Sequence, residues 1–317
     1  MPPTPKNTPV TVGDFYQKHA DELELELVSG EAGLDRVIGE PTVNRPGLAL
    51  SGFYSYFADK RIQVIGSAEL SYLQSLTNRE REERLRRFFA SRMPCLVLAR
   101  KAKVSPLIER LAASADIPVF RTPMITMNFI NAATIALELV FAPRQSEHGS
   151  MVDIMGIGTL IRGASGIGKS ECVLSLLERG YSLVSDDITR FRSFEGKRLI
   201  GTSSELTRFH MEVRGIGIIN VAAIFGISSI RPEKTLDLVV TLEDWREMED
   251  VDRHGLHRHE YKILGISVPH VIIPVRMGRD LGRLVEVAAL DQKLKSLGTN
   301  SALEFNEKLI KMMEAKD

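Results

Sequence analysis

The hydrophobic positions in the first 142 residues follow two spacings. Short runs of consecutive apolar residues, which favour buried strands, occupy 62–66, 95–100 and 117–122. Between the last two runs, residues 107–116 carry apolar side chains at helical intervals. Strands that alternate with helices are typical of parallel βαβ units. The first part of the chain is therefore predicted to be a small α/β domain.

A long helical pattern and a polar stretch mark a boundary near the middle of the chain. Apolar residues at helical spacing extend over 124–142, and Pro143 followed by polar residues ends that pattern. A chain of 317 residues is long enough for two domains. We therefore predict one domain over 1–142 and a second over 143–317.

The second domain has its own succession of patterns. A β-prone run at 152–163 leads into a glycine-rich stretch, and a helical pattern follows at 171–180. A further apolar run, 181–185, is followed by two aspartates. Residues 210–221 contain an apolar run that is expected to be buried. Helical spacing returns at 301–317 with an apolar stripe that is expected to pack against the fold. The stripe consists of Leu303, Leu309, Ile310, Met312 and Met313.

Composition and charge exclude a general electrostatic partner. The chain is 44% hydrophobic and 26% charged, with 41 basic and 41 acidic residues. This balance gives no argument for a nucleic-acid or acidic-membrane partner. The arginine-rich segment 78–92 interleaves glutamates with its arginines and has one apolar face, formed by Leu85, Phe88 and Phe89. An amphipathic helix explains that segment better than a nucleic-acid site does.

Cysteine usage and the absence of targeting patterns indicate a cytoplasmic protein. Cys95 and Cys172 both lie in apolar runs and lack the spacing of a zinc or redox motif, so we expect reduced, packed thiols. The first ten residues have no apolar core of the kind that a signal peptide requires. No run approaches the roughly 18 apolar residues of a membrane span, so no membrane partner is predicted.

The glycine-rich stretch matches a phosphate-binding motif. Residues 163–170 fit the pattern G-x-x-x-x-G-K-[ST], with a strand predicted before them and a helix after them. In such a P-loop (Walker A motif), backbone N–H groups and a helix N-terminus face the phosphates. Lys169 would reach the β and γ phosphates, and the Ser170 hydroxyl would bind magnesium. The candidate nucleotide-binding residues are Gly163, Ala164, Ser165, Gly166, Ile167, Gly168, Lys169 and Ser170.

Acidic and basic residues follow the motif along the chain. Asp186 and Asp187 end the run beside the predicted loop, where a carboxylate can hold magnesium or accept a proton from an attacking hydroxyl. Glu212 and Arg214 precede a pair of glycines. They can serve as metal ligand and phosphate clamp, or form a surface ion pair on a hairpin. The residues alone leave both interpretations open.

Four stretches together resemble the HPr kinase/phosphorylase family, bacterial serine kinases that modify the phosphocarrier protein HPr. The likeness is dense from His148 to Lys295, whereas before that point it rests on the family's two-domain organisation. It implies a C-terminal kinase domain with a P-loop and a PEP carboxykinase-like fold. The stretches are GASGIGKSE (163–171), VSDD (184–187), EVRGIGIINV (212–221) and the distal segment 251–290.

The resemblance implies a role for each matching residue. Lys169 corresponds to the phosphate-binding lysine, while Ser170 and Glu212 correspond to the magnesium ligands. Asp187 corresponds to the acid that accepts the serine proton and returns it in the reverse reaction, and the neighbouring Asp186 supports it. Two further active-site residues are implied, namely His148 and Arg253.

The resemblance also implies a loop for dephosphorylation and an assembly. Two residues depart from the family pattern: Ala164 stands where many members carry an acid, and Met277 where many have proline. The family assembles as hexamers, so a homohexamer is implied. The loop consists of Pro274, Val275, Arg276, Met277, Gly278 and Arg279.

The reaction implied is transfer of a phosphoryl group from ATP, or from pyrophosphate, to a serine of an HPr-like carrier protein. A carboxylate must remove the serine proton, and magnesium, Lys169 and Arg253 would offset the charge on the phosphoryl oxygens. In the reverse direction, inorganic phosphate attacks phosphoserine and gives pyrophosphate and serine.

Two other functions fit parts of the chain. A P-loop kinase of small molecules leaves 212–221 without a role, and its loop would not be expected after a whole domain. A nucleotide-gated binding module would not need the acidic residues. The histidines at 254, 257 and 259 fit neither one helical face nor a zinc motif, so we predict no metal there.

Overall fold

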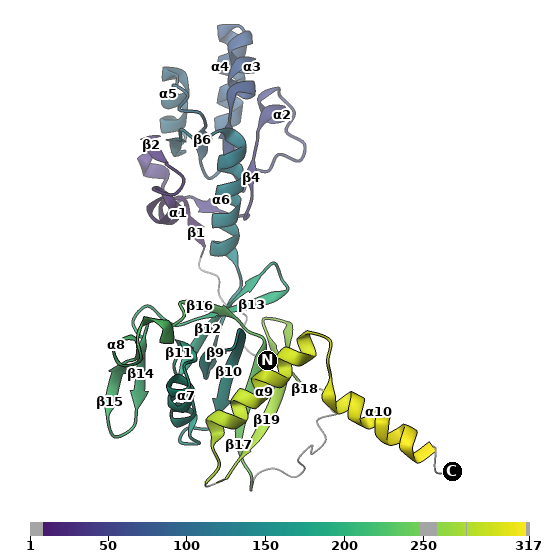
Figure 1. Ribbon diagram of the computed structural model, residues 1–317. Helices are drawn as coiled ribbons and strands as arrows, with labels where there is room; N and C mark the ends of the chain where they lie inside the picture. The colour runs from purple at the N-terminus through teal and green to yellow at the C-terminus, as the bar shows by residue number, and fades with distance from the viewer. Residues whose placement is uncertain (1–8, 247–258, 277, 315–317) are drawn as a thin grey trace. The chain divides into compact units, whose positions relative to one another are not determined.

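The computed structural model describes residues 9–246, 259–276 and 278–314 (Figure 1). The chain forms two compact units, Met1–Ala142 and Pro143–Asp317. Both units mix helices with strands, and each has hydrophobic clusters of its own. The two-part α/β architecture predicted from the sequence is confirmed.

The first unit is built on a five-stranded sheet of order β2-β7-β6-β5-β4. Strands β4 to β7 are parallel, and β2 pairs antiparallel with β7 at one edge. The helices are α1 (Val12–His19), α2 (Gly47–Leu50), α3 (Ser67–Ser75), α4 (Asn78–Phe89), α5 (Pro106–Ser114) and α6 (Thr126–Phe141). The strands are β1 (Val10–Thr11), β2 (Glu26–Ser29), β3 (Val37–Ile38), β4 (Val43–Asn44), β5 (Ile62–Ile65), β6 (Leu96–Leu98) and β7 (Val119–Arg121).

Helices cover both faces of this sheet, because successive strand residues point to opposite sides. Val64 of β5 packs in the cluster that contains Phe129 of α6, whereas Ile65 packs in the cluster that contains Leu73 of α3. Helix α4 buries its apolar face in the second cluster and exposes most of its arginines. The amphipathic helix predicted for this segment is confirmed.

The second unit contains a six-stranded sheet of order β11-β9-β10-β17-β19-β18 and a four-stranded sheet of order β16-β13-β12-β8. The helices are α7 (Lys169–Glu178), α8 (Val221–Phe225), α9 (Leu281–Ser296) and α10 (Ser301–Glu314). The strands of the larger sheet are β9 (Ser150–Ile154), β10 (Ile157–Gly163), β11 (Ser182–Ser185), β17 (Leu238–Asp244), β18 (His259–Ile263) and β19 (Ile266–Val275). The remaining strands are β8 (Arg144–His148), β12 (Ile188–Phe194), β13 (Arg198–Thr202), β14 (His210–Val213), β15 (Gly217–Asn220) and β16 (Glu233–Thr235).

Four strands of the larger sheet end at one edge. Strands β10, β17 and β19 are parallel. Strand β9 is antiparallel to both β10 and β11, so β11 runs in the same direction as β10. The segments that follow β10, β11, β17 and β19 therefore emerge side by side, which is where ligands bind in open α/β sheets.

The larger sheet lies between a helical layer and the smaller sheet. Val240 of β17 packs with Leu176 of α7 and Val285 of α9, which lie on the same face (Figure 1). Its neighbour Val239 packs with Phe191 of the smaller sheet on the opposite face. Burial on both faces explains why the central strands appear as continuous apolar runs in the sequence.

The β-prone run at 152–163 forms the hairpin of β9 and β10, which turns at Met155 and Gly156 with positive φ of 53° and 90°, so the strand predicted before the glycine-rich loop is confirmed. One expectation for a strand segment is corrected by the structure. The run in 210–221 was expected to be buried, yet Ile216 and Ile218 are 74% and 77% exposed. They lie on the two-stranded ribbon of β14 and β15, which has too few strands to cover both of its faces.

The expectation that the last helix packs against the fold is also wrong within this chain. Along α10, Leu303 is 43% exposed and Ile310 is 47% exposed, and the two methionines are more exposed still, at 63% and 70%. The helix extends away from the sheet after α9, so its apolar side chains face solvent (Figure 1). In the part of the chain that the structure describes, no helix combines the length and the apolar composition needed to cross a membrane.

Candidate active site

The glycine-rich loop, residues 163–170, joins the end of β10 to the start of α7. Gly166 and Gly168 have φ of 85° and 104°, values that favour glycine because it lacks a Cβ atom. A Cβ atom at residue 166 would lie 3.3 Å from Nη1 of Arg214. Helix α7 begins after Gly168 without a side-chain cap, so the N–H groups of its first turn are available to an anion.

Lys169 closes this loop on itself. Its Nζ atom donates hydrogen bonds to the carbonyl oxygens of Gly163 and Ala164, each at 2.9 Å. Both Lys169 and Ser170 are half-buried at the start of α7. The ammonium group is thus positioned over the loop, where phosphate oxygens can replace the two carbonyls as acceptors.

The acid pair follows β11 at the same edge of the sheet. The hydroxyl of Ser150 donates to Oδ1 of Asp186 at 2.7 Å and accepts from the backbone N–H of Asp187 at 3.3 Å. Burial raises the pKa of Asp186 above its ordinary value; hydrogen bonds from Ser150 and from two backbone N–H groups act in the opposite direction. Asp187 is exposed, with a φ of 58° that aspartate tolerates better than most residues.

Strand β14 links the acid pair to the glycine-rich loop. The backbone N–H of Glu212 donates to Oδ2 of Asp186 at 3.1 Å. Two residues further along, Nη2 of Arg214 donates to Oγ of Ser165 in the loop at 3.4 Å. The segment is a hairpin, but among the described residues no ion pair joins Glu212 to Arg214. The hairpin instead connects the two parts of the site that the sequence predicted separately.

His148 lies beside the acid pair. It ends β8 directly opposite Ile188 of β12, and the next residue, Gly149, donates its N–H to the carbonyl of Asp187 at 2.8 Å. The His148 side chain is exposed, and its carbonyl accepts a hydrogen bond from Arg162 at 3.4 Å. The active-site role of this histidine stays a prediction.

The loop predicted for dephosphorylation starts at the same edge of the sheet. Pro274 and Val275 end β19, and the guanidinium carbon of Arg276 lies 4.3 Å from the centre of the Trp245 ring. The Trp245 N–H also donates to the carbonyl of Val275 at 3.4 Å. Gly278 and Arg279 are exposed. Four positions named in the sequence analysis lie outside the described residues: Arg253, Met277 and the histidines at 254 and 257.

Two residues of this site were not predicted from the sequence. Ser150 is a polar residue at the start of an apolar run and directly follows His148 and Gly149, which is a weak signal. Trp245 is the one tryptophan of the chain and follows a buried strand, a stronger signal because exposed aromatic residues often bind ligands. It comes directly after Asp244, whose pKa is lowered to about 2 by hydrogen bonds from Arg246.

The oxygen atoms in this site are of the kind that magnesium prefers. A hydroxyl from Ser170 and carboxylates from Glu212 and Asp186 are hard donors. Among the described residues, no group of three or more His, Cys, Asp or Glu side chains is arranged to hold a metal. Magnesium in nucleotide sites needs only one or two carboxylates, because substrate phosphates and water supply the remaining ligands. The residues present therefore fit a magnesium–nucleotide complex.

A loop that can hold phosphate, a lysine within it and an acid pair tied to it define a phosphoryl-transfer enzyme of the kinase class. Comparison with known proteins agrees with this class. The family model "HPr Serine kinase C-terminal domain" matches residues 139–309, and "HPr Serine kinase N terminus" matches residues 10–137.

Individual relatives cover nearly the whole chain. The HPr kinase/phosphorylase of Leptospira biflexa is 42% identical over 303 residues, which cover 95% of this chain and 94% of the relative. The HPr kinase/phosphorylase of Geobacter sulfurreducens is 40% identical over 294 residues, which cover 93% of this chain and 92% of the relative. The solved structure of the Hpr(Ser) kinase/phosphatase from Coxiella burnetii is 33% identical, with a TM-score of 0.46; it covers 51% of this chain and 99% of that one. The chain belongs to the HPr kinase/phosphorylase family, and the predicted resemblance is confirmed.

Proposed function

We propose that this protein transfers the γ-phosphoryl group of ATP to a serine of an HPr-like carrier protein, and that it also catalyses phosphorolysis of the phosphoserine. The observation that supports this most directly is the connection through β14, which holds Asp186 and the glycine-rich loop together. The relatives named HPr kinase/phosphorylase support the choice of a protein substrate.

In this proposal the glycine-rich loop is a P-loop, and the second unit has a PEP carboxykinase-like kinase fold. The loop amides and Lys169 bind the β and γ phosphates, and Ser170 and Glu212 ligate magnesium. Magnesium supplies positive charge at the phosphoryl oxygens as the transfer proceeds. Arg276 and Arg279 extend the positive charge toward the carrier, together with Arg253.

Asp187 is the general base of the forward reaction. It is exposed at the sheet edge, where a serine hydroxyl on another protein can reach it, whereas Asp186 is partly buried and hydrogen-bonded. Asp187 takes the serine proton while the O–P bond forms. In phosphorolysis it returns that proton to the departing serine as phosphate attacks, because the O–P bond at the serine that forms in phosphorylation is the bond that breaks in phosphorolysis.

Purified carrier protein tests the proposal. Incubation of the chain with ATP, magnesium and a purified HPr is expected to give one phosphoserine, located by mass spectrometry. Addition of inorganic phosphate after removal of ATP is expected to reverse the modification with release of pyrophosphate. ATP consumption on a panel of small metabolites, with no modified carrier, would instead establish a small-molecule kinase.

The Asp187→Asn variant tests the shared proton relay. Asparagine has almost the same shape and also tolerates positive φ, so the backbone at residue 187 is preserved. Both directions are expected to fall by at least about 100-fold, since general acid–base catalysis contributes about that much. Glu195→Gln, an exposed acid in the turn between β12 and β13, is the matched control. Near wild-type rates in either direction of the Asp187 variant would overturn the assignment.

We also propose that the protein assembles as a homohexamer. The exposed apolar stripe of α10 supports assembly, because a face of that kind is usually covered by a partner. Light scattering after size exclusion is expected to give six times the chain mass of 35.3 kDa. A monomer at micromolar concentration would contradict the proposal.

A further inference from the structure

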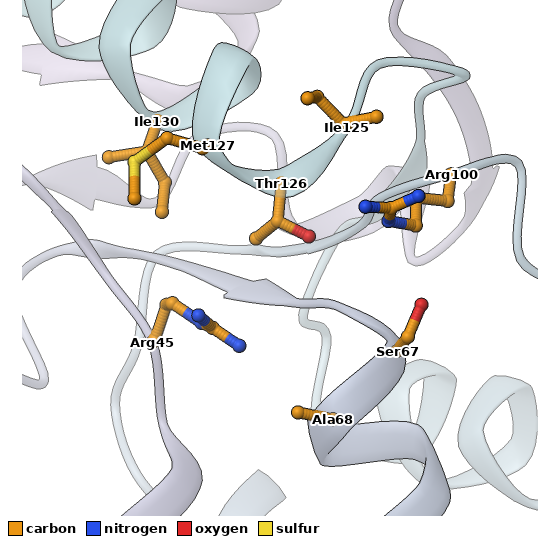
Figure 2. A pocket seen from close by; sticks show the side chains of 8 residues that line it. All are labelled: Arg45, Ser67, Ala68, Arg100, Ile125, Thr126, Met127 and Ile130. Carbon is orange, nitrogen blue, oxygen red and sulfur yellow. The ribbon is translucent and has the colours of Figure 1, made fainter.

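A pocket in the first unit takes no part in the site described above. It has a volume of about 260 Å³ and opens at the carboxyl edge of the parallel strands (Figure 2). Its lining comes from four separate connections, those that follow β4, β5, β6 and β7. The lining residues are Arg45, Ser67, Ala68, Arg100, Ile125, Thr126, Met127 and Ile130.

The topology of the sheet places this pocket where open α/β sheets bind ligands. After β5 the chain enters α3 on one face of the sheet, and after β7 it enters α6 on the opposite face. The starts of the two helices are close together, since a Cβ atom on Gly66 would lie 2.4 Å from Oγ1 of Thr126. A crevice between helices that leave the sheet on opposite faces is the usual ligand site of such folds.

Two arginines give this pocket a positive charge. Arg45 is held by a two-pronged ion pair with the buried Glu69, whose carboxylate also accepts from the N–H of Gly66 at 2.9 Å. Arg100 comes from the neighbouring connection, where its backbone N–H donates to the carbonyl of Met124 at 2.9 Å. Within the part of the chain that the structure describes, the Arg100 guanidinium has no ion-pair partner.

The charge balance therefore favours an anion. One carboxylate faces two guanidinium groups, and the positive ends of α3 and α6 add to the excess. The hydroxyls of Ser67 and Thr126 border the same space (Figure 2). Arginine forks, hydroxyls and helix N-termini are the groups that bind phosphate in proteins.

The start of α6 adds apolar side chains to the pocket. Ile125 and Met127 are 43% and 59% exposed, although both lie at the start of a helix that is otherwise well packed. Together with Ile130 they provide a surface for an uncharged part of a ligand. The volume is slightly below the range of about 300 to 1,000 Å³ typical of small-molecule sites, so the ligand is small.

We propose that this pocket binds a small phosphate ester, with the phosphate between Arg45 and Arg100 and the organic part against Ile125 and Met127. The proposal does not depend on the activity assigned to the second unit. It gives the first unit a ligand-binding role that is separate from the site formed by the glycine-rich loop and the acid pair.

Methyl NMR of the full-length chain provides a readout inside the pocket. With methionine methyl groups labelled by ¹³C, the signal of Met127 is identified by its loss in Met127→Leu. Titration with AMP is expected to shift this signal in a saturable way, and inorganic phosphate is expected to bind more weakly because it cannot use the apolar side chains. Adenosine, which lacks the phosphate, is expected to leave the signal unchanged. Binding at the glycine-rich loop of the second unit is expected to shift the signal of Met211 instead, which precedes Glu212 in β14 and packs with Val173 of α7, so the two sites are distinguished.

Charge variants complete the test. Arg100→Gln is expected to weaken AMP binding at Met127 by roughly tenfold or more, since a charge-assisted contact to phosphate is lost. Arg79→Gln, an exposed arginine of α4 that does not line the pocket, is the matched control and should bind normally. Absence of any Met127 shift with AMP and phosphate at 10 mM, or an unchanged affinity in Arg100→Gln with correct folding shown by the other methyl signals, would overturn the proposal.

Discussion

The guanidinium carbon of Arg276 lies 4.3 Å from the centre of the Trp245 ring. The contact joins the ends of two adjacent parallel strands, β17 and β19, next to the strand that carries the glycine-rich loop. A cation held over an aromatic face keeps its charge and donor groups on the outer side available to a ligand. The pair therefore holds Arg276 at the edge of the sheet where the glycine-rich loop also begins.

Replacement of Trp245 by leucine is expected to reduce phosphorolysis more than phosphorylation. A partly exposed cation–π contact contributes about 0.5 to 1 kcal/mol, so the loss should slow phosphorolysis by about two- to fivefold. Steady-state rates in both directions, measured on the same preparation, check this. Trp245→Phe keeps an aromatic face, so its rate of phosphorolysis should lie between those of the unmodified chain and of Trp245→Leu. Equal losses in both directions would show that Arg276 is not specific to the reverse reaction.

The Ser150→Ala variant should alter the pH dependence of both reactions. The hydroxyl of Ser150 donates to Asp186 and lowers the pKa of that carboxyl, so its removal raises the pKa further. A raised pKa means that protonation of Asp186 begins at a higher pH, and the acidic limb of the kcat/KM profile should move upward. A hydrogen bond to a charged group contributes about 1.5 kcal/mol or more, so rates at pH values on the acidic limb should fall by roughly tenfold.

The control for this variant is Ser146→Ala, which changes an exposed serine of β8 at a distance of two residues from His148. Its profile should match that of the unmodified chain. An acidic limb that stays in place in Ser150→Ala would show that Asp186 does not govern the rate.

Features that are contiguous in the sequence predict the fold and the glycine-rich loop well. The runs that become β5, β6 and β7 are buried on both faces, so an unbroken apolar pattern identifies them. The glycine-rich loop is likewise a continuous motif, because the groups that would bind phosphate come from one turn of backbone and the start of the helix that follows it. Residues that act together and are adjacent in the chain leave a local signal.

Contacts between distant segments leave no such signal. Ser150 and Asp186 are 36 residues apart, and their contact depends on the antiparallel pairing of β9 with β11. The exposure of Ile216 and Ile218 could not be predicted either, because a run of apolar residues does not show whether a second layer covers it. For the same reason, the pocket of the first unit was missed, since four separate connections form it.

Asp280 connects the start of α9 to the helix of the glycine-rich loop. Its carboxylate accepts from the N–H of Arg283 at 2.9 Å, and it forms an ion pair of 2.5 Å with Arg179 at the end of α7. The hydrogen bond from Arg283 and the charge of Arg179 lower the pKa of Asp280 below 3.8. Such a group stabilises the fold above its ordinary pKa, and the stabilisation is lost as pH falls through the lowered value.

Asp280→Ala is therefore expected to lower the melting temperature by about 2 to 4 °C at pH 7, as loss of a helix cap does in a domain of this size. The difference from the unmodified chain should shrink as the pH falls from 3.8 through the lowered pKa of the folded state, because below that value the aspartate is protonated in both folded and unfolded forms. Asp280→Asn retains a capping oxygen but lacks the charge, so its melting temperature should lie between those of the unmodified chain and of Asp280→Ala. Calorimetry across this pH range measures all three. A loss of melting temperature in Asp280→Ala that is independent of pH would show that the charge of Asp280 does not contribute to stability.

Both cysteines are expected to be unreactive in the folded protein. Burial raises the pKa of the Cys95 and Cys172 thiols from 9.0 to about 12. A raised thiol pKa stabilises the fold below the ordinary value, and that stabilisation is lost only as pH rises toward 12. At pH 8 only about one thiol in 10,000 is then the reactive thiolate, which predicts slow alkylation by iodoacetamide.

The same reagent should label both cysteines rapidly in urea, where the pKa returns to its ordinary range. Peptide mass spectrometry after timed labelling separates the two sites. Cys172 lies three residues after Lys169 in the helix of the glycine-rich loop, so its labelling rate reports local opening of that helix. Saturating ATP and magnesium should slow labelling of Cys172 while leaving Cys95 unchanged, because a ligand that binds the folded loop opposes its opening. If ATP does not slow the labelling of Cys172 in the folded chain, then α7 opens independently of nucleotide binding, which would contradict this prediction.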